Sequence, residues 1–111
     1  MVDDKFKMVD DKVNDLNKLI EYSKDGILSK VLIKSEKNNV TLFCMAAGTE
    51  MTEHTSTKEG TVHVVEGKGV FTLEGEKIAM IPNILIHMEK NAVHSLKAEE
   101  NTTFILSLHK E

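Results

Sequence analysis

Short segments in which apolar and polar residues alternate run from residue 27 to residue 109. Each segment is rich in Val, Ile, Thr or Phe and ends at Gly, Asn or charged residues, which is typical of β-strands separated by turns. With turn residues roughly every 8–12 positions, the pattern favours an antiparallel sandwich or barrel of eight or nine strands over a parallel α/β fold. The candidate strands are 27–33, 40–46, 49–53, 61–66, 70–73, 76–81, 84–88, 93–98 and 102–109.

Glycines mark two of the turns between these strands. The four residues 66–69, Glu-Gly-Lys-Gly, separate the candidate strands 61–66 and 70–73, and Glu74-Gly75 follows the second of them. Glycine adopts the positive φ that a tight hairpin requires. The sequence therefore predicts a hairpin at each of these two places.

The pattern before residue 27 has a helical period instead. Asp10 and Asp11 suit a helix N-terminus, and Gly26 is a stop signal. These features predict a short amphipathic helix at about 11–22, within a connecting region 10–26. We expect residues 1–9 to be a flexible terminus; the pentapeptide Met-Val-Asp-Asp-Lys occurs at 1–5 and again at 8–12, and the sequence does not indicate its role. The apolar stripe of the helix is Val13, Leu16 and Ile20.

Composition indicates one folded domain. The chain has 111 residues, of which 41% are hydrophobic and 29% charged, enough apolar content for a single core. Its net charge of -4 comes from 14 basic and 18 acidic residues, with no basic block that could neutralise several phosphates, so we expect no nucleic-acid partner.

Membrane and secreted locations are also disfavoured. The N-terminal residues are too charged for a signal peptide, and no apolar run reaches the roughly 18 residues of a membrane span. The single cysteine, Cys44, lies in an apolar run and is expected to be buried and reduced. We therefore expect a cytoplasmic protein that does not contact a membrane.

Two segments of the chain each combine a turn residue with a histidine further along the segment. In the first, Gly48 is followed after five residues by His54, and Gly67 closes the segment. In the second, Asn83 follows a proline, and His94 comes after the next predicted strand. Asn tolerates a left-handed turn better than other non-glycine residues, so Asn83 is suited to a turn position.

These two segments resemble the two sequence motifs of the cupin family, in particular its small single-domain members. The resemblance implies an all-β fold, an antiparallel double-stranded β-helix (jelly-roll or cupin barrel) over residues 27–111, with a short N-terminal helix before it. It also implies that His54 and His94 face the interior of the barrel.

The resemblance further implies a metal site, although with an incomplete ligand set. Cupin enzymes usually hold Zn, Ni, Fe or Mn with three histidines and one glutamate. Here Ser56 stands at the second histidine position and Gly60 at the glutamate position. Glu59 is one residue away, and strand alternation sends it to the opposite face unless a bulge turns it inward. The expected metal ligands are His54 and His94, with Glu59 as a third if such a bulge forms.

The remaining histidines and the methionines are given structural roles. His63 lies between two valines that suit the core, so alternation predicts that it faces outward. His87 and His109 are expected at the surface or at strand ends, although His87 also has the option of facing the barrel mouth. Four methionines are expected to supply pliable core packing and pocket lining rather than a soft-metal site. They are Met45, Met51, Met80 and Met88.

Three functions are compatible with this sequence. The favoured one is binding of a small polar ligand in the barrel mouth by His54, Ser56 and His94. The first alternative is a metal-dependent cupin enzyme, of oxygenase, isomerase or decarboxylase type, that uses His54 and His94. The second alternative is a dimeric assembly module without chemistry, because small barrels leave sheet edges to cover and a homodimer covers them.

Overall fold

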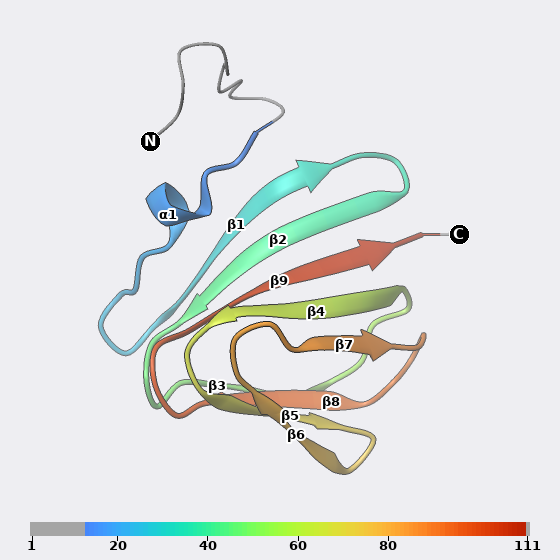
Figure 1. The fold of residues 1–111 in the computed structure, drawn as a ribbon. Coiled ribbons are helices and arrows are strands. Elements are labelled where there is room, and N and C mark those ends of the chain that lie inside the picture. The colour runs from blue at the N-terminus through green and yellow to red at the C-terminus, as the bar shows by residue number, and fades with distance from the viewer. Residues whose placement is uncertain (1–12, 111) are drawn as a thin grey trace.

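Nine antiparallel strands in two sheets make up most of the computed structural model, which describes residues 13–110 (Figure 1). The five-stranded sheet has the order β1-β2-β9-β4-β7, with β1 Ile27–Lys34, β2 Asn38–Met45, β9 Thr102–His109, β4 Glu59–Glu66 and β7 Leu85–Met88. The four-stranded sheet has the order β3-β8-β5-β6, with β3 Glu50–His54, β8 His94–Ala98, β5 Gly69–Leu73 and β6 Glu76–Met80. The predicted all-β architecture is confirmed, and each strand begins and ends within two residues of its predicted bounds.

The core lies between the two sheets and is built by strand alternation. Val62 and Val64 of β4 point inward, and His63 between them is exposed, as predicted. On β2, Phe43 points inward and stacks on Phe104 of β9, with ring centroids 5.1 Å apart. The buried cluster comprises Met45, Val62, Val64, Phe71, Met80, Ile86, Met88, Leu96, Ala98 and Phe104.

The helix is shorter than predicted. Of the expected helix 11–22, residues 11 and 12 lie outside the described residues, as does the terminus 1–9, and α1 spans Leu16–Leu19 alone. The side chain of Asp15 accepts a hydrogen bond from the backbone N–H of Asn17 at 3.1 Å, so the cap lies later than Asp10 and Asp11. The helix ends at Ile20, where the backbone becomes extended.

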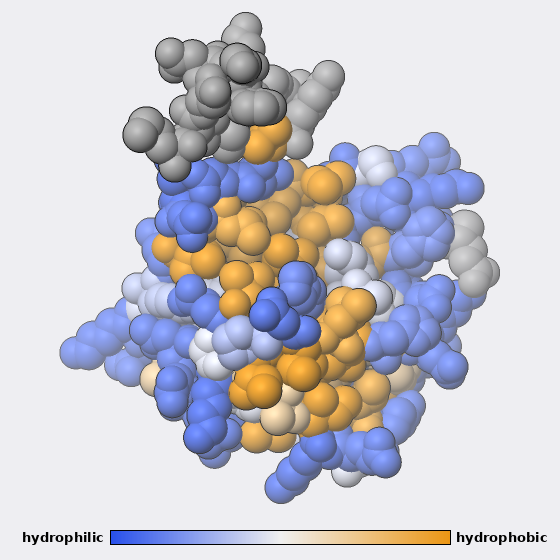
Figure 2. Space-filling model, viewed as in Figure 1, coloured by the Kyte–Doolittle hydropathy of each residue, from blue (hydrophilic) through white to orange (hydrophobic). Residues whose placement is uncertain are grey.

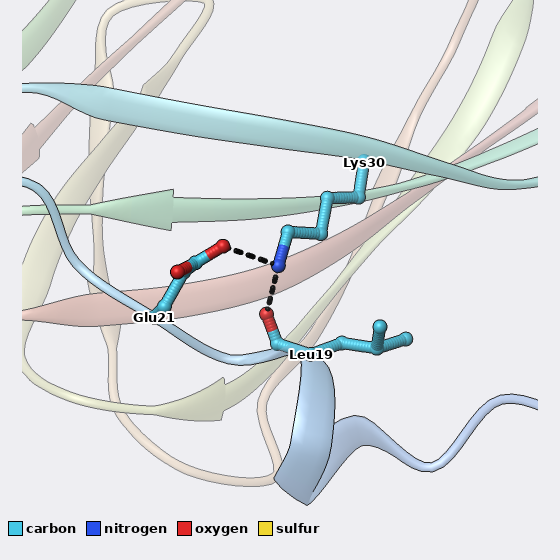
Figure 3. Close-up of polar contacts among 3 residues, drawn as sticks. All are labelled: Leu19, Glu21 and Lys30. Atoms are coloured by element: carbon cyan, nitrogen blue, oxygen red, sulfur yellow. Dashed lines mark hydrogen bonds and ion pairs between the residues drawn. The ribbon is translucent and has the colours of Figure 1, made fainter.

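Residues after α1 are held against the five-stranded sheet by polar contacts. The ammonium group of Lys30, on β1, donates to the carbonyl oxygen of Leu19 at 2.7 Å and lies 2.6 Å from the carboxylate of Glu21 (Figure 3). The hydroxyl of Tyr22 hydrogen-bonds to Glu66 and Thr103. These contacts hold the extended chain that follows α1 against the sheet.

The predicted hairpin at residues 66–69 is wrong. Strand β4 belongs to the five-stranded sheet and β5 to the four-stranded sheet, so the turn carries the chain from one sheet to the other. Gly67 has φ +105° and a Cβ there would lie 2.3 Å from the carbonyl oxygen of Asn101. The glycine therefore permits close approach of two backbones rather than a hairpin.

Two other turn predictions are confirmed. Strands β5 and β6 are joined by Glu74 and Gly75, whose φ values of 48° and 83° are those of a two-residue hairpin turn. Asn83 has φ 74°, in the left-handed region expected of a turn residue. Both turns follow from local sequence chemistry alone.

A considerable hydrophobic area remains on the surface. Figure 2 shows hydrophobic residues gathered along the middle of one face, with hydrophilic residues on both sides. Among the described residues, the large hydrophobic side chains with more than half of their surface exposed are Val31, Ile33 and Leu85. In residues 13–110 there is no helix with the length and apolar character needed to cross a membrane.

Candidate functional site

His54 and His94 are in contact at the end of one strand and the start of the next. His54 closes β3, His94 opens β8, and the two residues are Cα partners in the ladder between these strands. Their ring centroids lie 4.1 Å apart with an angle of 61° between the ring planes. The two motif histidines, 40 positions apart in the sequence, therefore form one pair.

Each imidazole of this pair is held by a backbone carbonyl two residues earlier. Nδ1 of His54 lies 2.7 Å from the carbonyl oxygen of Thr52, and Nδ1 of His94 lies 3.0 Å from that of Ala92. A carbonyl oxygen accepts but cannot donate, so both Nδ1 atoms carry the proton. In the neutral ring, Nε2 is then the atom with a free lone pair, available to a hydrogen-bond donor or a metal ion.

The two rings differ in their surroundings. His54 is exposed, whereas His94 is buried at 6% exposure, with its ring parallel to that of Phe71. Burial lowers the pKa of His94, and the neighbouring His54 lowers it further, against the hydrogen bond to Ala92, which raises it. The pair thus joins a solvent-facing imidazole to a neutral interior one.

A small cavity of about 60 Å³ lies in the barrel interior beside the pair. Its wall is almost entirely apolar, with His54 and His94 as its ionisable groups. A volume of this size accommodates a few water molecules or a ligand of a few heavy atoms, and is far below the roughly 300–1,000 Å³ of a drug-sized pocket. The remaining lining residues are Phe43, Met51, Val62, Phe71, Met88, Leu96, Phe104 and Leu106.

Ser56, the third residue of the expected site, lies in the loop after β3. Its hydroxyl accepts a hydrogen bond from the backbone N–H of Lys58 at 3.1 Å, and its carbonyl oxygen accepts one from Asn91 at 2.7 Å. Ser56 is not part of the cavity wall. Its contacts are those of a loop-stabilising residue.

Glu59 points away from the barrel interior. It lies on β4 with no bulge before Thr61, and its carboxylate meets Nε2 of His87 at 2.6 Å on the outer face of the sheet. The bulge that would have turned Glu59 toward His54 is therefore absent from this part of the strand, and Glu59 cannot act as the third ligand there. His87 likewise does not face the barrel mouth.

The glutamate position of the motif is sterically closed in this backbone. A Cβ on Gly60 would lie 2.7 Å from a methyl carbon of Leu108 and 2.8 Å from the carbonyl oxygen of Ser107. The second contact is with backbone, which cannot move aside as a flexible side chain does. Strand β9 therefore passes too close to Gly60 for a carboxylate side chain there without a local shift.

The residues present do not fit the four-ligand centre that the family's enzymes use. Within residues 13–110, no three His, Cys, Asp or Glu side chains are arranged to hold a metal ion. Two imidazoles without a carboxylate leave the charge of a divalent ion unneutralised in an apolar cavity. A metal centre of the family's usual type therefore does not fit this cavity.

Of the residues that complete the cavity, sequence reasoning missed Phe71, whereas Met51 and Met88 are among the methionines expected to line a pocket. Phe71 stacks on His94, and Met51 and Met88 line the same space as the histidines. Alternation places Met88 and Phe71 inside the barrel, but no sequence signal indicates that they meet His54 and His94. Cys44, as expected, is free and buried.

Comparison with known proteins identifies the family. The model of the cupin domain matches residues 41–108, which is more than half of the chain, and includes both histidines. The chain belongs to the cupin family. No curated protein matches it.

Solved structures agree on the fold. A conserved protein of unknown function from Streptococcus pyogenes is 24% identical, with a TM-score of 0.82 and 96% of each chain covered. A cupin superfamily protein from Desulfitobacterium hafniense is 19% identical, with a TM-score of 0.83, 94% of this chain and 95% of that one. Salicylate 1,2-dioxygenase from Pseudoaminobacter salicylatoxidans is 16% identical, with a TM-score of 0.72, 79% of this chain and 26% of that one. At these identities the likeness establishes the cupin barrel and not an activity.

Proposed function

We propose that this protein binds one small ligand at the mouth of its barrel, through Nε2 of His54 and His94. The observation that carries the proposal is the contact between the two imidazoles, each held by a carbonyl at Nδ1. Two rings fixed in this way present their remaining nitrogens without first losing rotamer freedom, which lowers the entropic cost of binding.

The burial of the pair supports a route from solvent to the interior. His54 is exposed and His94 is buried beside the cavity, so a ligand that meets His54 has only to pass one ring to reach His94. Because the cavity is about 60 Å³ and apolar, it suits a ligand of a few heavy atoms with one polar or electrophilic group at the histidines. Ser56 is left out of the proposed site because it does not line the cavity.

Nuclear magnetic resonance of the imidazole nitrogens tests this proposal directly. Formate, acetate, ethylene glycol, Zn(II) and Ag(I) are titrated separately into ¹⁵N-histidine-labelled protein. At least one of these probes is expected to shift the His54 and His94 signals together. The shift should disappear in His54→Ala and persist in His63→Ala, which removes an exposed histidine from the outer face of β4.

Two results would overturn the proposal. One is that none of the five probes moves either signal at millimolar concentration. The other is that the shift survives in the His54→Ala, His94→Ala double variant. If an organic probe binds but EDTA removes it, the site belongs instead to the metal-dependent enzyme hypothesis, and direct binding by the imidazoles is wrong.

We also propose a homodimer, because one outer face has the surface for it. A groove of about 460 Å³ crosses the outer face of the five-stranded sheet, lined by Ile33, Val40 and Leu108 among others. Its one carboxylate, Glu59, is already paired with His87. A face with little unpaired charge and an aliphatic Ile33 exposed at 52% suits a second copy of the same face related by two-fold symmetry.

Sedimentation velocity tests the dimer with a matched pair of substitutions. Ile33 pairs with Val40 in the ladder and Val31 pairs with Thr41, so the bulge between them puts the two side chains on opposite faces of β1. Ile33→Glu is expected to shift the protein to monomer, and Val31→Glu, at a position that is also more than half exposed, is expected to leave the dimer intact. If the wild-type protein sediments as a monomer at micromolar concentration, the proposed homodimer is wrong.

A further inference from the structure

Two methionine side chains face the same cavity as His54 and His94. Met51 lies three residues before His54 on β3, and Met88 is the Cα partner of Gly60 between β7 and β4. Met88 therefore stands beside the position at which the family's glutamate would be, where this chain has no side chain. The cavity thus gathers two imidazoles and two thioethers from three strands.

This set of donor atoms differs in chemical type from the three histidines and one glutamate that cupin enzymes usually use. Carboxylate oxygens favour hard divalent ions, whereas thioether sulfur is a soft ligand that favours copper(I), and imidazole suits copper as well. No carboxylate is among the residues that line the cavity. The exchange of Glu for a neighbouring Met changes the class of ion that the cavity can hold.

The charge of the donor atoms also favours a monovalent ion such as copper(I). All four donors are neutral, so an ion keeps its full charge inside an apolar wall. The cost of transferring an ion from water to an apolar medium rises with the square of its charge, so it is about four times larger for a divalent than for a monovalent ion of equal size. A neutral donor set therefore selects against zinc, nickel or iron(II) and in favour of a monovalent ion.

The size of the cavity fits a bare ion. An ion that gives up its water to protein ligands needs less space than one water molecule in the liquid, about 30 Å³. The cavity of about 60 Å³ is therefore large enough for an ion coordinated by side chains of its wall, and it is too small for a drug-sized organic ligand. Phe71 and Phe104 in its wall would keep bulk water away from an ion held there.

We propose that the barrel interior holds one copper(I) ion, with Nε2 of His54 and His94 and the thioether sulfurs of Met51 and Met88 as its ligands. This inference rests on the proposed function, because it uses the same two histidines, and it adds the class of ligand. It assigns to Met51 and Met88 a binding role that core packing alone does not give them.

Silver(I) and copper(I) are the probes that test it. Silver(I) is a soft monovalent ion that is not oxidised during the experiment, and copper(I) is used under argon against a chromophoric competitor. The measurements use a Cys44→Ala background, or Cys44→Val if that variant does not fold, because a thiol also binds both ions. One tight site per chain is expected, with zinc(II) bound at least tenfold more weakly than copper(I).

Leucine substitutions separate ligation from packing. Met51→Leu and Met88→Leu keep the volume and remove the sulfur, and each is expected to weaken binding of copper(I) at least tenfold. Met80→Leu is the matched control, since Met80 is fully buried in the same core but does not line the cavity. In ¹³C-methyl-methionine spectra, silver(I) should shift the methyl signals of Met51 and Met88 and leave that of Met80 unmoved.

The outcomes distinguish this inference from the function on which it rests. If copper(I) binds equally to wild type, Met51→Leu and Met88→Leu, the thioether ligands are wrong, and loss of binding in His54→Ala would still support the histidine site. If zinc(II) binds as tightly as copper(I), selection of a soft monovalent ion is wrong. If binding is the same in His54→Ala and wild type, both proposals fail. Thermal unfolding of each variant confirms that it is folded.

Discussion

The imidazole of His94 lies parallel to the ring of Phe71, with ring centroids 5.7 Å apart and an angle of 6° between the planes. It also meets the imidazole of His54 edge to face. An imidazolium in this position would lose water without gaining an anionic partner, so burial holds the pKa of His94 below its ordinary value of about 6.5. At neutral pH the ring of His94 is therefore uncharged, and its Nε2 acts as a hydrogen-bond acceptor or as a metal ligand.

Stability should fall on mild acidification because of His94. Its pKa is lower in the folded than in the unfolded chain, so as pH falls below about 6.5 the unfolded state binds more protons than the folded state. The contribution present above pH 6.5 is then lost progressively as pH approaches the folded-state pKa. Urea unfolding at about pH 7.5 and pH 5 should show a midpoint that decreases more in wild type than in His94→Gln.

The control for this titration is an exposed histidine. The matched variant is His63→Gln, which removes an exposed histidine from β4 and leaves His94 in place, so the acid decrease caused by His94 should remain. A His94→Gln variant that keeps the full wild-type decrease would show that other groups are responsible for the loss of stability in acid.

Gly60 should be intolerant of even one methyl group. The Cβ of Gly60→Ala would approach the carbonyl oxygen of Ser107 to 2.8 Å and Leu108 to 2.7 Å, so β4 and β9 must separate locally. Overpacking of this kind costs on the order of 1–3 kcal/mol. The measurement is the free energy of unfolding in urea; an unchanged value would mean that the two strands adjust freely and that a glutamate could be restored at this position.

Much of the fold could be predicted because its signals are local. Alternation in β4 places Val62 and Val64 inside and His63 outside, and the same rule sends Glu59 away from the histidines. Positive φ at Asn83 follows from the tolerance of Asn for that conformation. Each of these outcomes depends on one strand or one turn.

What could not be predicted depends on which elements meet in space. Residues 66–69 have hairpin chemistry, yet the chain there changes sheets because Gly67 lies against Asn101. The four residues of the proposed copper site come from β3, β7 and β8, and only the register between strands brings Met88 beside Gly60 and His94 beside His54. No sequence spacing encodes that convergence.

Glu59 provides a test of the outward orientation. Its carboxylate contacts His87 in a pair that is about half exposed on both sides, and pairs of this kind contribute about 0–1 kcal/mol. Glu59→Gln should therefore change stability little and leave copper(I) or probe binding at His54 and His94 unaltered. Equilibrium titration of the variant against wild type checks this, and a large loss of affinity would place the carboxylate inside the barrel.

Tyr22 is the single tyrosine of the chain, so its phenolate absorbance reports one site. Burial raises its pKa strongly above the ordinary value of about 10, and its hydrogen bond to Glu66 raises it further, against the bond to Thr103, which lowers it. Ultraviolet titration of the folded protein should therefore show a midpoint well above 10. Glu66→Gln should lower that midpoint, because it removes an anion 2.8 Å from the hydroxyl, whereas Glu76→Gln, an exposed residue on β6, should not. A midpoint near 10 in wild type would mean that residues around Tyr22 are detached from the sheet in solution.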